Sequence, residues 1–246
     1  MTHNLKILKM KDNSDSFVTK KKKLFDLPMR LLIIGKTGDA KSTYLGNLLL
    51  REEMYRNDFE PENIFIFSGS LAGDKKMKTI IEELEIPKSN LYSEFDNDML
   101  NAIYELQEEQ FKEKTDEGIR DKKKLNSLII FDDLAYQDTF KSGTKDDGIR
   151  RIFFNGRKFL ISCIIISQKY TSVGTSLREN ASGLVLGKSS NKQLEIIEQD
   201  HNYLTDGKKK FLKMYREATD IPFGKLVINF SEPNLYFNQD FEVLND

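Results

Sequence analysis

The chain has 246 residues, of which 39% are hydrophobic and 31% are charged, and its formal net charge at pH 7 is −1. This composition is typical of a soluble globular protein with room for one large α/β domain, and the near-zero charge excludes nucleic-acid binding by overall basicity. The longest apolar stretch, residues 159–166, is too short to cross a bilayer, and the N-terminus has no apolar secretory segment. We therefore expect a cytosolic protein without a membrane segment.

Short apolar runs alternate with amphipathic segments from residue 30 onward. The first 24 residues are polar and without a hydrophobic period, which predicts an N-terminal arm at 1–24. We expect strands at 30–35, 63–69, 127–133, 161–167, 182–187 and 223–230, and helices at 41–56, 75–86, 97–115, 148–158, 191–200 and 208–218. This alternation predicts an α/β fold with a mostly parallel central sheet and helices on both faces. We place the folded domain at 25–235 and a C-terminal tail at 236–246.

Three of the predicted strands end in polar residues. The first leads into Gly35, the third into Asp132 and Asp133, and the fourth into Ser167 and Gln168. Ligands of parallel sheets bind beyond the carboxyl ends of the strands. We expect these residues to converge on one site.

Residues 35–42, GKTGDAKS, match the phosphate-loop pattern G-x-x-x-x-[GA]-K-[ST] between a strand and a helix. Backbone N–H groups of such a loop bind the β-phosphate of ATP, while Lys41 offsets phosphate charge and Ser42 supplies a hydroxyl to Mg²⁺. Ala40 stands where glycine is commoner. Its methyl group disfavours a positive φ, and the loop can still form if φ is negative there. The predicted nucleotide contacts are Gly35, Lys36, Thr37, Gly38, Asp39, Ala40, Lys41, Ser42 and Thr43.

The acidic pair at the end of the third strand suggests divided roles. Asp132 is expected to hold the Mg²⁺ shell, and Asp133 to accept a proton from the attacking water or to orient it. The second position is more often Glu in this class, and Asp is one methylene shorter. The structural alternative is an Asx turn at the strand end.

Gln168 and two arginines complete the predicted catalytic set. A glutamine at the end of the fourth strand can hydrogen-bond the γ-phosphate or the attacking water. Arg157 precedes that strand and Arg178 follows it. Either arginine is a candidate for a finger that acts across a subunit boundary, and either could instead form a structural salt bridge.

Taken together, these motifs resemble the FtsK–HerA superfamily of DNA-pumping ATPases. The resemblance is carried by GKTGDAKS, LIIFDD, GRKFLISCIIISQ, SLREN and GLVLG, within residues 28–235. The compact size and the IIFDD pair look most like viral genome-packaging ATPases of the poxvirus, giant-virus and phage type. The ending REATDIPFGKLVINFSEP is similar to the carboxyl end of those proteins.

The resemblance implies a RecA-like (ASCE) P-loop NTPase that packages viral double-stranded DNA into a capsid. It implies ATP with Mg²⁺ as cofactors, a homo-oligomeric ring (a pentamer or hexamer) with DNA in its channel, and an arginine in trans. The expected partners are double-stranded DNA, further copies of the chain and the capsid or portal vertex. The expected location is the host cytoplasm, at the viral procapsid.

Other functions share some of these motifs. An ATPase for helicase loading, recombination or conjugation-type transfer would carry the same site. A nucleotide-binding regulatory protein with little hydrolysis is compatible with the shorter Asp133. A small-molecule kinase shares the phosphate loop, but Gln168 and the acidic pair suit water activation better, and no lid motif is evident.

A motor that moves along any sequence must contact phosphates rather than base edges. Three lysine-bearing segments are candidates for that contact, each expected to be mobile. They are 122–124, the loop 135–148 with Lys141 and Lys145, and 208–210. The loop is favoured because it begins two residues after Asp133 and contains two glycines that permit movement.

Overall fold

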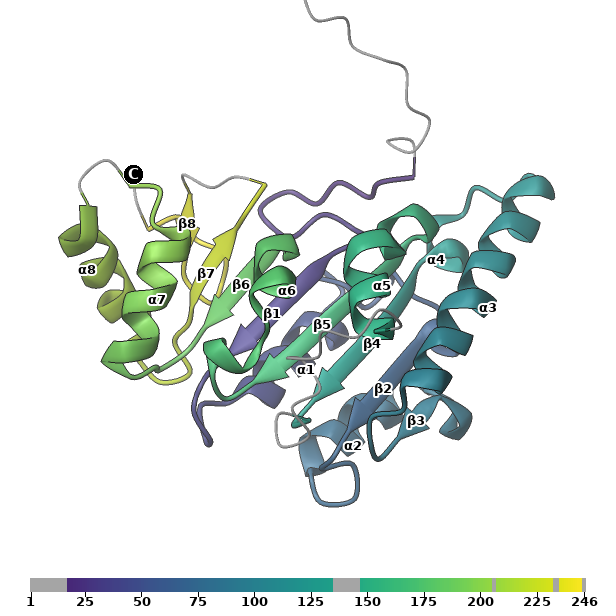
Figure 1. Ribbon diagram of the computed structural model, residues 1–246, viewed down its shortest axis with the longest axis horizontal. Coiled ribbons are helices and arrows are strands. Elements are labelled where there is room, and N and C mark those ends of the chain that lie inside the picture. The colour runs from purple at the N-terminus through teal and green to yellow at the C-terminus, as the bar shows by residue number, and fades with distance from the viewer. Residues whose placement is uncertain (1–16, 135–146, 205–206, 232–234, 245–246) are drawn as a thin grey trace, which may run out of the picture.

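The computed structural model describes residues 17–134, 147–204, 207–231 and 235–244. They contain one sheet of eight strands in the order β3-β2-β4-β5-β1-β6-β7-β8 (Figure 1). The strands are β1 (Arg30–Ile34), β2 (Ile64–Ser68), β3 (Leu91–Tyr92), β4 (Ser127–Asp132), β5 (Ile161–Ser167), β6 (Gly183–Leu186), β7 (Leu226–Asn229) and β8 (Tyr236–Phe237).

The sheet is parallel from β3 to β6, which confirms the predicted fold class. Strand β5 lies between β1 and β4, with Ser167 opposite Ile34 and Ile166 opposite Asp132. The three strands therefore end at the same edge. This order brings the phosphate loop, the acidic pair and Gln168 to one side of the sheet.

The last two strands run antiparallel to their neighbours. Leu186 at the end of β6 pairs with Leu226 at the start of β7, and β8 pairs with β7. The sheet thus extends past residue 235, into the segment for which the sequence suggested a tail. Phe237 and Phe241 are buried there.

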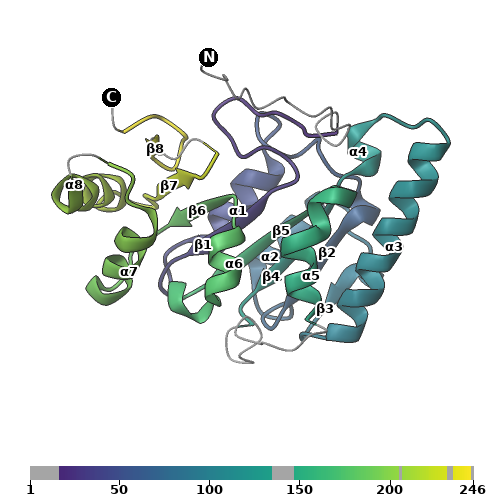
Figure 2. The same ribbon diagram turned by 45° about the horizontal axis from the view of Figure 1, so that its top comes forward.

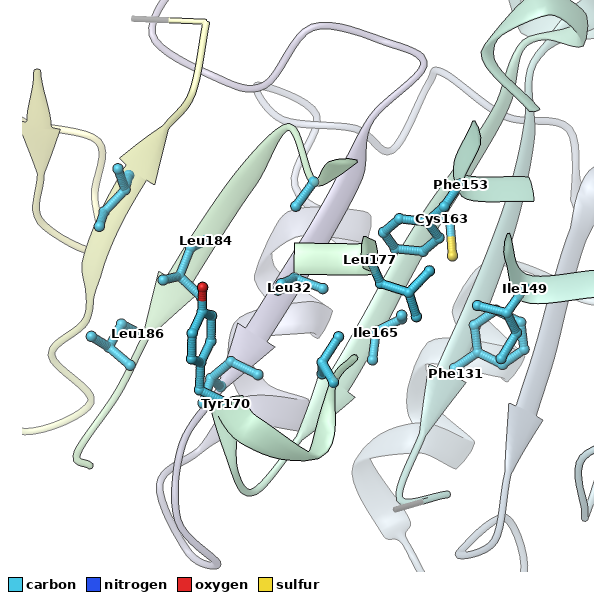
Figure 3. Packing of buried hydrophobic residues seen from close by; sticks show 14 of the residues in the cluster. Leu32, Phe131, Ile149, Phe153, Cys163, Ile165, Tyr170, Leu177, Leu184 and Leu186 are labelled. Atoms are coloured by element: carbon cyan, nitrogen blue, oxygen red, sulfur yellow. The ribbon is translucent and has the colours of Figure 1, made fainter. Parts of the chain in front are cut away.

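Helices cover both faces of the sheet (Figures 1 and 2). Because strand side chains alternate between faces, each strand contributes to two cores. One core packs against α1 and α2, and the other against α3, α5, α6, α7 and α8. Figure 3 shows part of the second core, where Leu177 and Phe153 lie over Leu32, Cys163 and Ile165. The helices are α1 (Lys41–Leu50), α2 (Lys75–Glu83), α3 (Asn97–Asp116), α4 (Lys122–Leu125), α5 (Gly148–Asn155), α6 (Thr175–Asn180), α7 (Asn191–His201) and α8 (Gly207–Thr219).

Several segments differ from the sequence-based expectation. Helix α1 ends at Leu50 rather than at 56, because Arg51 has an extended backbone. The lysine run 122–124 forms the short helix α4 instead of a mobile segment, with Asp121 as its N-cap. The run 208–210 lies in the first turns of α8. Of the favoured DNA-contact loop 135–148, residues 135–146 with Lys141 and Lys145 lie outside the described residues.

The described part of the N-terminal arm contacts the folded domain. Thr19 forms a β-bridge with Leu27, and the Lys21 ammonium lies 2.5 Å from the Asp58 carboxylate. Phe17 packs edge-on against Phe111 of α3. None of the helices in the described ranges has the length and apolar character that a membrane crossing needs.

Candidate nucleotide site

A cavity of about 350 Å³ opens at the carboxyl ends of β1, β4 and β5. The phosphate loop forms one wall and the ends of β4 and β5 another, as the strand order requires. Its remaining wall comes from the segment between β2 and α2, which the sequence analysis did not assign to the site. The lining residues are Thr37, Gly38, Lys41, Ser42, Ser70, Gly73, Asp74, Asp132, Asp133, Ile166, Ser167 and Gln168.

The phosphate loop is tied to the strands on both sides of β1. The N–H of Gly35 donates to the Ser167 carbonyl at 3.2 Å, and the N–H of Lys36 donates to the Lys188 carbonyl at 3.3 Å. Gly38 has a φ of 80°, a conformation that glycine adopts without strain. These bonds hold the loop between β5 and the end of β6.

The loop forms at Ala40 without the negative φ that the sequence analysis gave as the condition for it. Ala40 has φ 54° and ψ 32°, the left-handed conformation, and it is the N-cap of α1. The loop needs this turn to direct the N-terminus of α1 into the cavity, whichever residue occupies the position. An alanine there costs about 1–2 kcal/mol, because its Cβ crowds the following carbonyl.

Lys41 lies inside the loop. Its ammonium donates to the carbonyls of Gly35 at 2.8 Å and Lys36 at 3.0 Å. Burial lowers the pKa of this ammonium, and the nearby carboxylates of Asp132, Asp39 and Asp133 oppose that change. A partly buried cation among backbone N–H groups is suited to bind phosphate oxygens.

One carboxylate, that of Asp74, lies next to Ser42, and another, that of Asp132, lies at the end of β4. The Ser42 hydroxyl donates to Asp74 Oδ2 at 3.0 Å, and the Ser68 hydroxyl donates to Asp132 Oδ2 at 3.3 Å. The pKa of Asp132 is raised to about 6, mainly by burial and then by the charges of Asp133 and Asp74, while Ser68 and Lys41 act in the opposite direction. Mutual repulsion among carboxylates is what a bound divalent cation relieves, and hydroxyl and carboxylate oxygens are the ligands that Mg²⁺ prefers. Ser42, Asp132 and Asp74 therefore fit a magnesium ion.

Asp74 was missed by the sequence analysis. It follows β2 and caps α2, where its Oδ1 accepts from the N–H groups of Lys76 and Met77. An aspartate before a helix is adequately explained as an N-cap, so the sequence offered no reason to assign it to the site. One signal was available, because β2 was predicted and its end lies at the same edge as the ends of β1 and β4.

Gln168 connects the phosphate loop to the acidic pair. Its Oε1 accepts from the Thr37 hydroxyl at 3.2 Å, and its Nε2 donates to Asp133 Oδ1 at 3.4 Å. Both Gln168 and Asp133 are exposed to the cavity side, and Asp133 has a φ of 53°. Because the backbone makes a left-handed turn at Asp133, the two aspartates point in different directions. Asp132 is buried and Asp133 is exposed. A carboxylate held by an amide in this way can accept a proton from water.

The two arginines do not lie in this cavity. The guanidinium of Arg178 donates to Asp200 Oδ2 at 2.6 Å and lies over the ring of Tyr170, with its side chain 13% exposed. This is the structural salt bridge that the sequence left open as an alternative. Arg157 is exposed in the 3₁₀ turn before β5, at the opposite end of that strand. A seven-residue strand separates it by about 20 Å from its own chain's cavity.

Comparison with known proteins identifies a family. The family model described as Poxvirus A32 protein matches residues 16–228, most of the chain. A search of the curated proteins finds no match.

Among the solved structures with a similar fold, two come from viruses and one from a conjugation system. The genome packaging NTPase B204 of Sulfolobus turreted icosahedral virus 2, in complex with AMPPCP, is 10% identical with a TM-score of 0.56, and covers 85% of this chain and 96% of its own. The DNA-packaging ATPase B204 of Sulfolobus turreted icosahedral virus is 14% identical, with a TM-score of 0.53, over 86% and 97%. The pCW3 conjugation coupling protein TcpA, with ATPγS, is 12% identical, with a TM-score of 0.55, over 93% and 65%. At these identities the likeness concerns the fold.

Proposed function

Because the chain belongs to the Poxvirus A32 protein family, we propose that it is an ATP-hydrolysing motor that packages viral double-stranded DNA into a capsid. The observation that carries this proposal is the arrangement around the cavity. Lys41 and Ser42 from the phosphate loop line the cavity with the acidic pair at the end of β4. Gln168, directly after β5, contacts Thr37 of the loop and Asp133 of the pair. The similar fold of the two viral packaging enzymes supports the same function.

In the proposed reaction the phosphate loop binds the triphosphate through its backbone N–H groups and Lys41. Ser42 and Asp132 would hold Mg²⁺, with Asp74 beside them, and that ion would offset charge on the β- and γ-phosphates. Asp133 accepts the proton of the attacking water, and the Gln168 amide orients its carboxylate. Gln168 also accepts a hydrogen bond from Thr37 of the phosphate loop. Loss of the γ-phosphate can therefore shift the end of β5 through this one side chain.

Of the two finger candidates, Arg157 is the one that we propose to act in trans. Arg178 is committed to Asp200 and Tyr170, and withdrawing it would break a 2.6 Å ion pair and a contact between its guanidinium and the Tyr170 ring. Arg157 is exposed at the edge of the sheet opposite the cavity. A neighbouring subunit that placed this edge against the cavity would complete the site, which is the arrangement expected of a ring.

The proposal is tested by measuring ATP hydrolysis with and without linear double-stranded DNA while the protein concentration is varied. We expect hydrolysis to rise with concentration, because a trans arginine requires assembly, and to rise again with DNA. Single-stranded DNA of equal length is the control for nonspecific charge effects. ATP binding without hydrolysis at every concentration would instead favour a regulatory nucleotide-binding protein.

The trans arginine is tested by mixing variants. Arg157→Ala and Lys41→Ala subunits are each expected to be inactive alone, and their mixture should regain part of the activity at interfaces where an intact loop meets an intact arginine. Mixtures of Arg178→Ala with Lys41→Ala serve as the comparison, and rescue there but not with Arg157→Ala would reverse the assignment. Absence of rescue from both, in rings shown to be mixed, would argue against a shared site.

A further inference from the structure

Asp39 of the phosphate loop lies in a slot that two glycines keep open. A Cβ at Gly187 or at Gly35 would overlap the Asp39 carboxylate. Within the slot, Asp39 Oδ2 accepts a hydrogen bond of 2.9 Å from the N–H of Lys188. The ends of β1 and β6 are therefore shaped around this one side chain.

A buried cation lies beside that carboxylate. Lys225 has no exposed surface, and its ammonium lies 3.7 Å from Asp39 Oδ1. It also donates to the carbonyls of Phe223 at 3.2 Å and Gly224 at 3.1 Å. A buried ammonium requires compensation by a counter-charge and by hydrogen bonds, and Asp39 with the two carbonyls provides both.

The direction of β7 explains how Lys225 reaches the loop. Because β7 is antiparallel to β6, its first residue, Leu226, pairs with Leu186 at the edge where the parallel strands end. Lys225 comes directly before β7 and is therefore adjacent to the phosphate loop. A parallel last strand would have placed this lysine at the far edge of the sheet.

The pair has an electrostatic consequence for nucleotide binding. Asp39 is two residues from Lys41, and its negative charge opposes the binding of a polyanion and attracts the Lys41 ammonium. The Lys225 ammonium offsets the Asp39 charge from its buried position just before β7, and Lys225 does not line the cavity. Burial lowers the pKa of Lys225, and Asp39 opposes this change.

We propose that Lys225 is a positioning residue for ATP binding, which acts by neutralising the charge of Asp39 within the phosphate loop. Lys225 acts through Asp39 and does not itself contact the nucleotide. The inference rests on the proposed ATP site. It assigns a function to the segment between α8 and β7, which has no part in the motifs of the phosphate loop or the acidic pair.

The experiment measures the Kd of Mg-ATP by titration calorimetry for the unaltered chain and four variants. Lys225→Met removes the buried charge at nearly constant volume, and we expect roughly tenfold weaker ATP binding. Asp39→Asn removes the opposing charge, and we expect binding about threefold tighter. The double variant should return to within about threefold of the unaltered chain. Lys192→Met, which removes an exposed lysine from α7, is the matched control and should change the Kd by less than about twofold.

The opposite signs of the two single variants distinguish this role from a structural one. If the pair only stabilised the fold, both single variants would weaken ATP binding and lower the unfolding temperature together, and that result would overturn the inference. Should Lys225→Met fail to fold, Asp39→Asn decides alone, because weaker ATP binding in that variant contradicts the proposal. If the unaltered chain binds no ATP, the proposed function fails and this role with it. If it binds ATP but the variants do not differ, only the role fails.

Discussion

The parallel and antiparallel parts of the sheet place residues at the phosphate-loop edge from opposite ends of their strands. Strands β1, β4 and β5 supply Gly35, Asp132 and Gln168 where they end. Strand β7 supplies Lys225 just before it begins, because it runs the other way. Strand direction therefore decides which residues of a segment reach this edge of the sheet.

The two parts also differ in burial. In the parallel part, Asp133 and Gln168 are exposed and can contact nucleotide and water. In the antiparallel extension, the polar side chains Lys225 and His201 that contact β7 or its flanking residues are buried. Substitutions of these exposed residues should therefore alter catalysis with little effect on stability, and substitutions of the buried residues in the extension should alter stability or nucleotide affinity.

The largest effect is expected for Lys41→Ala. Its ammonium is the cation held within the phosphate loop, so its loss should reduce ATP hydrolysis by roughly 10³-fold or more, while the free energy of unfolding changes by about 1 kcal/mol at most. Hydrolysis is measured by phosphate release and unfolding by urea titration. Lys78→Ala on the exposed face of α2 is the control. Ordinary turnover by Lys41→Ala would contradict the proposed site.

The next effect is expected for Asp133→Asn. A neutral amide cannot accept the proton of water, so hydrolysis should fall by roughly 10²–10⁴-fold while ATP still binds. Asparagine tolerates the φ of 53° at this position as well as aspartate does, so the backbone should not change. ATP binding is measured with a nucleotide analogue that is not hydrolysed. Loss of binding rather than of hydrolysis would mean that the roles of Asp132 and Asp133 are reversed.

The difference between the two parts also marks how far the sequence could be interpreted. The phosphate loop, the acidic pair and Gln168 were predictable, because each follows a recognisable apolar strand and parallel strands end at one edge. Their meeting in one cavity is confirmed by the geometry, and their catalytic roles stay predictions. The φ of Ala40 was not predictable, because closure of the loop onto β5 and β6 decides it.

Residues whose roles depend on tertiary contacts were either not assigned to the site from the sequence or left with two alternative roles. Asp74 meets Ser42 only because β2 and β1 end at one edge. Predicting that Lys225 lies beside the phosphate loop would have required the direction of β7, and an alternating strand pattern does not specify that direction. Predicting the partner of Arg178 would have required the packing of α6 beside α7, which brings Asp200, 22 positions away in the sequence, next to Arg178. In each case the local pattern is compatible with several partners, and only the packed fold selects one.

In the antiparallel extension, His201 should make stability depend on pH. It stacks on Phe230 after β7, and burial lowers its pKa from 6.5 to about 4. The Tyr170 hydroxyl donates to Asp200 and so accepts from His201 Nε2, while Nδ1 has no hydrogen-bond partner among the described residues. The folded state therefore disfavours a second proton on the ring.

The sign follows from the depressed pKa. Between pH 6.5 and 4 the unfolded chain binds a proton at His201 that the folded chain does not, so stability is fully present above pH 6.5 and is lost as the pH falls. From pH 7 to 5 the loss should be about 2 kcal/mol. Urea unfolding of the unaltered chain and of His201→Gln at both pH values measures it, since glutamine does not titrate and the remaining carboxylates are common to both. An equal pH dependence in the two proteins would show that His201 is not the group responsible.

The smallest expected effect returns to the parallel part, at Ala40. Its φ of 54° costs alanine about 1–2 kcal/mol, whereas glycine adopts the conformation freely but loses about 0.5–1 kcal/mol through the greater entropy of the unfolded chain. The balance predicts that Ala40→Gly raises the free energy of unfolding by about 0.5–1 kcal/mol, measured by urea titration.

Gly38→Ala is the matched opposite. Gly38 also has a positive φ, and a Cβ there would have no atom within 4 Å, so the substitution adds backbone strain and no steric clash. By the same balance of backbone strain against unfolded-chain entropy, that variant should lose about 0.5–1 kcal/mol. A destabilised Ala40→Gly, beside the expected loss in Gly38→Ala, would mean that residue 40 has a negative φ after all, and that the loop accommodates alanine without strain.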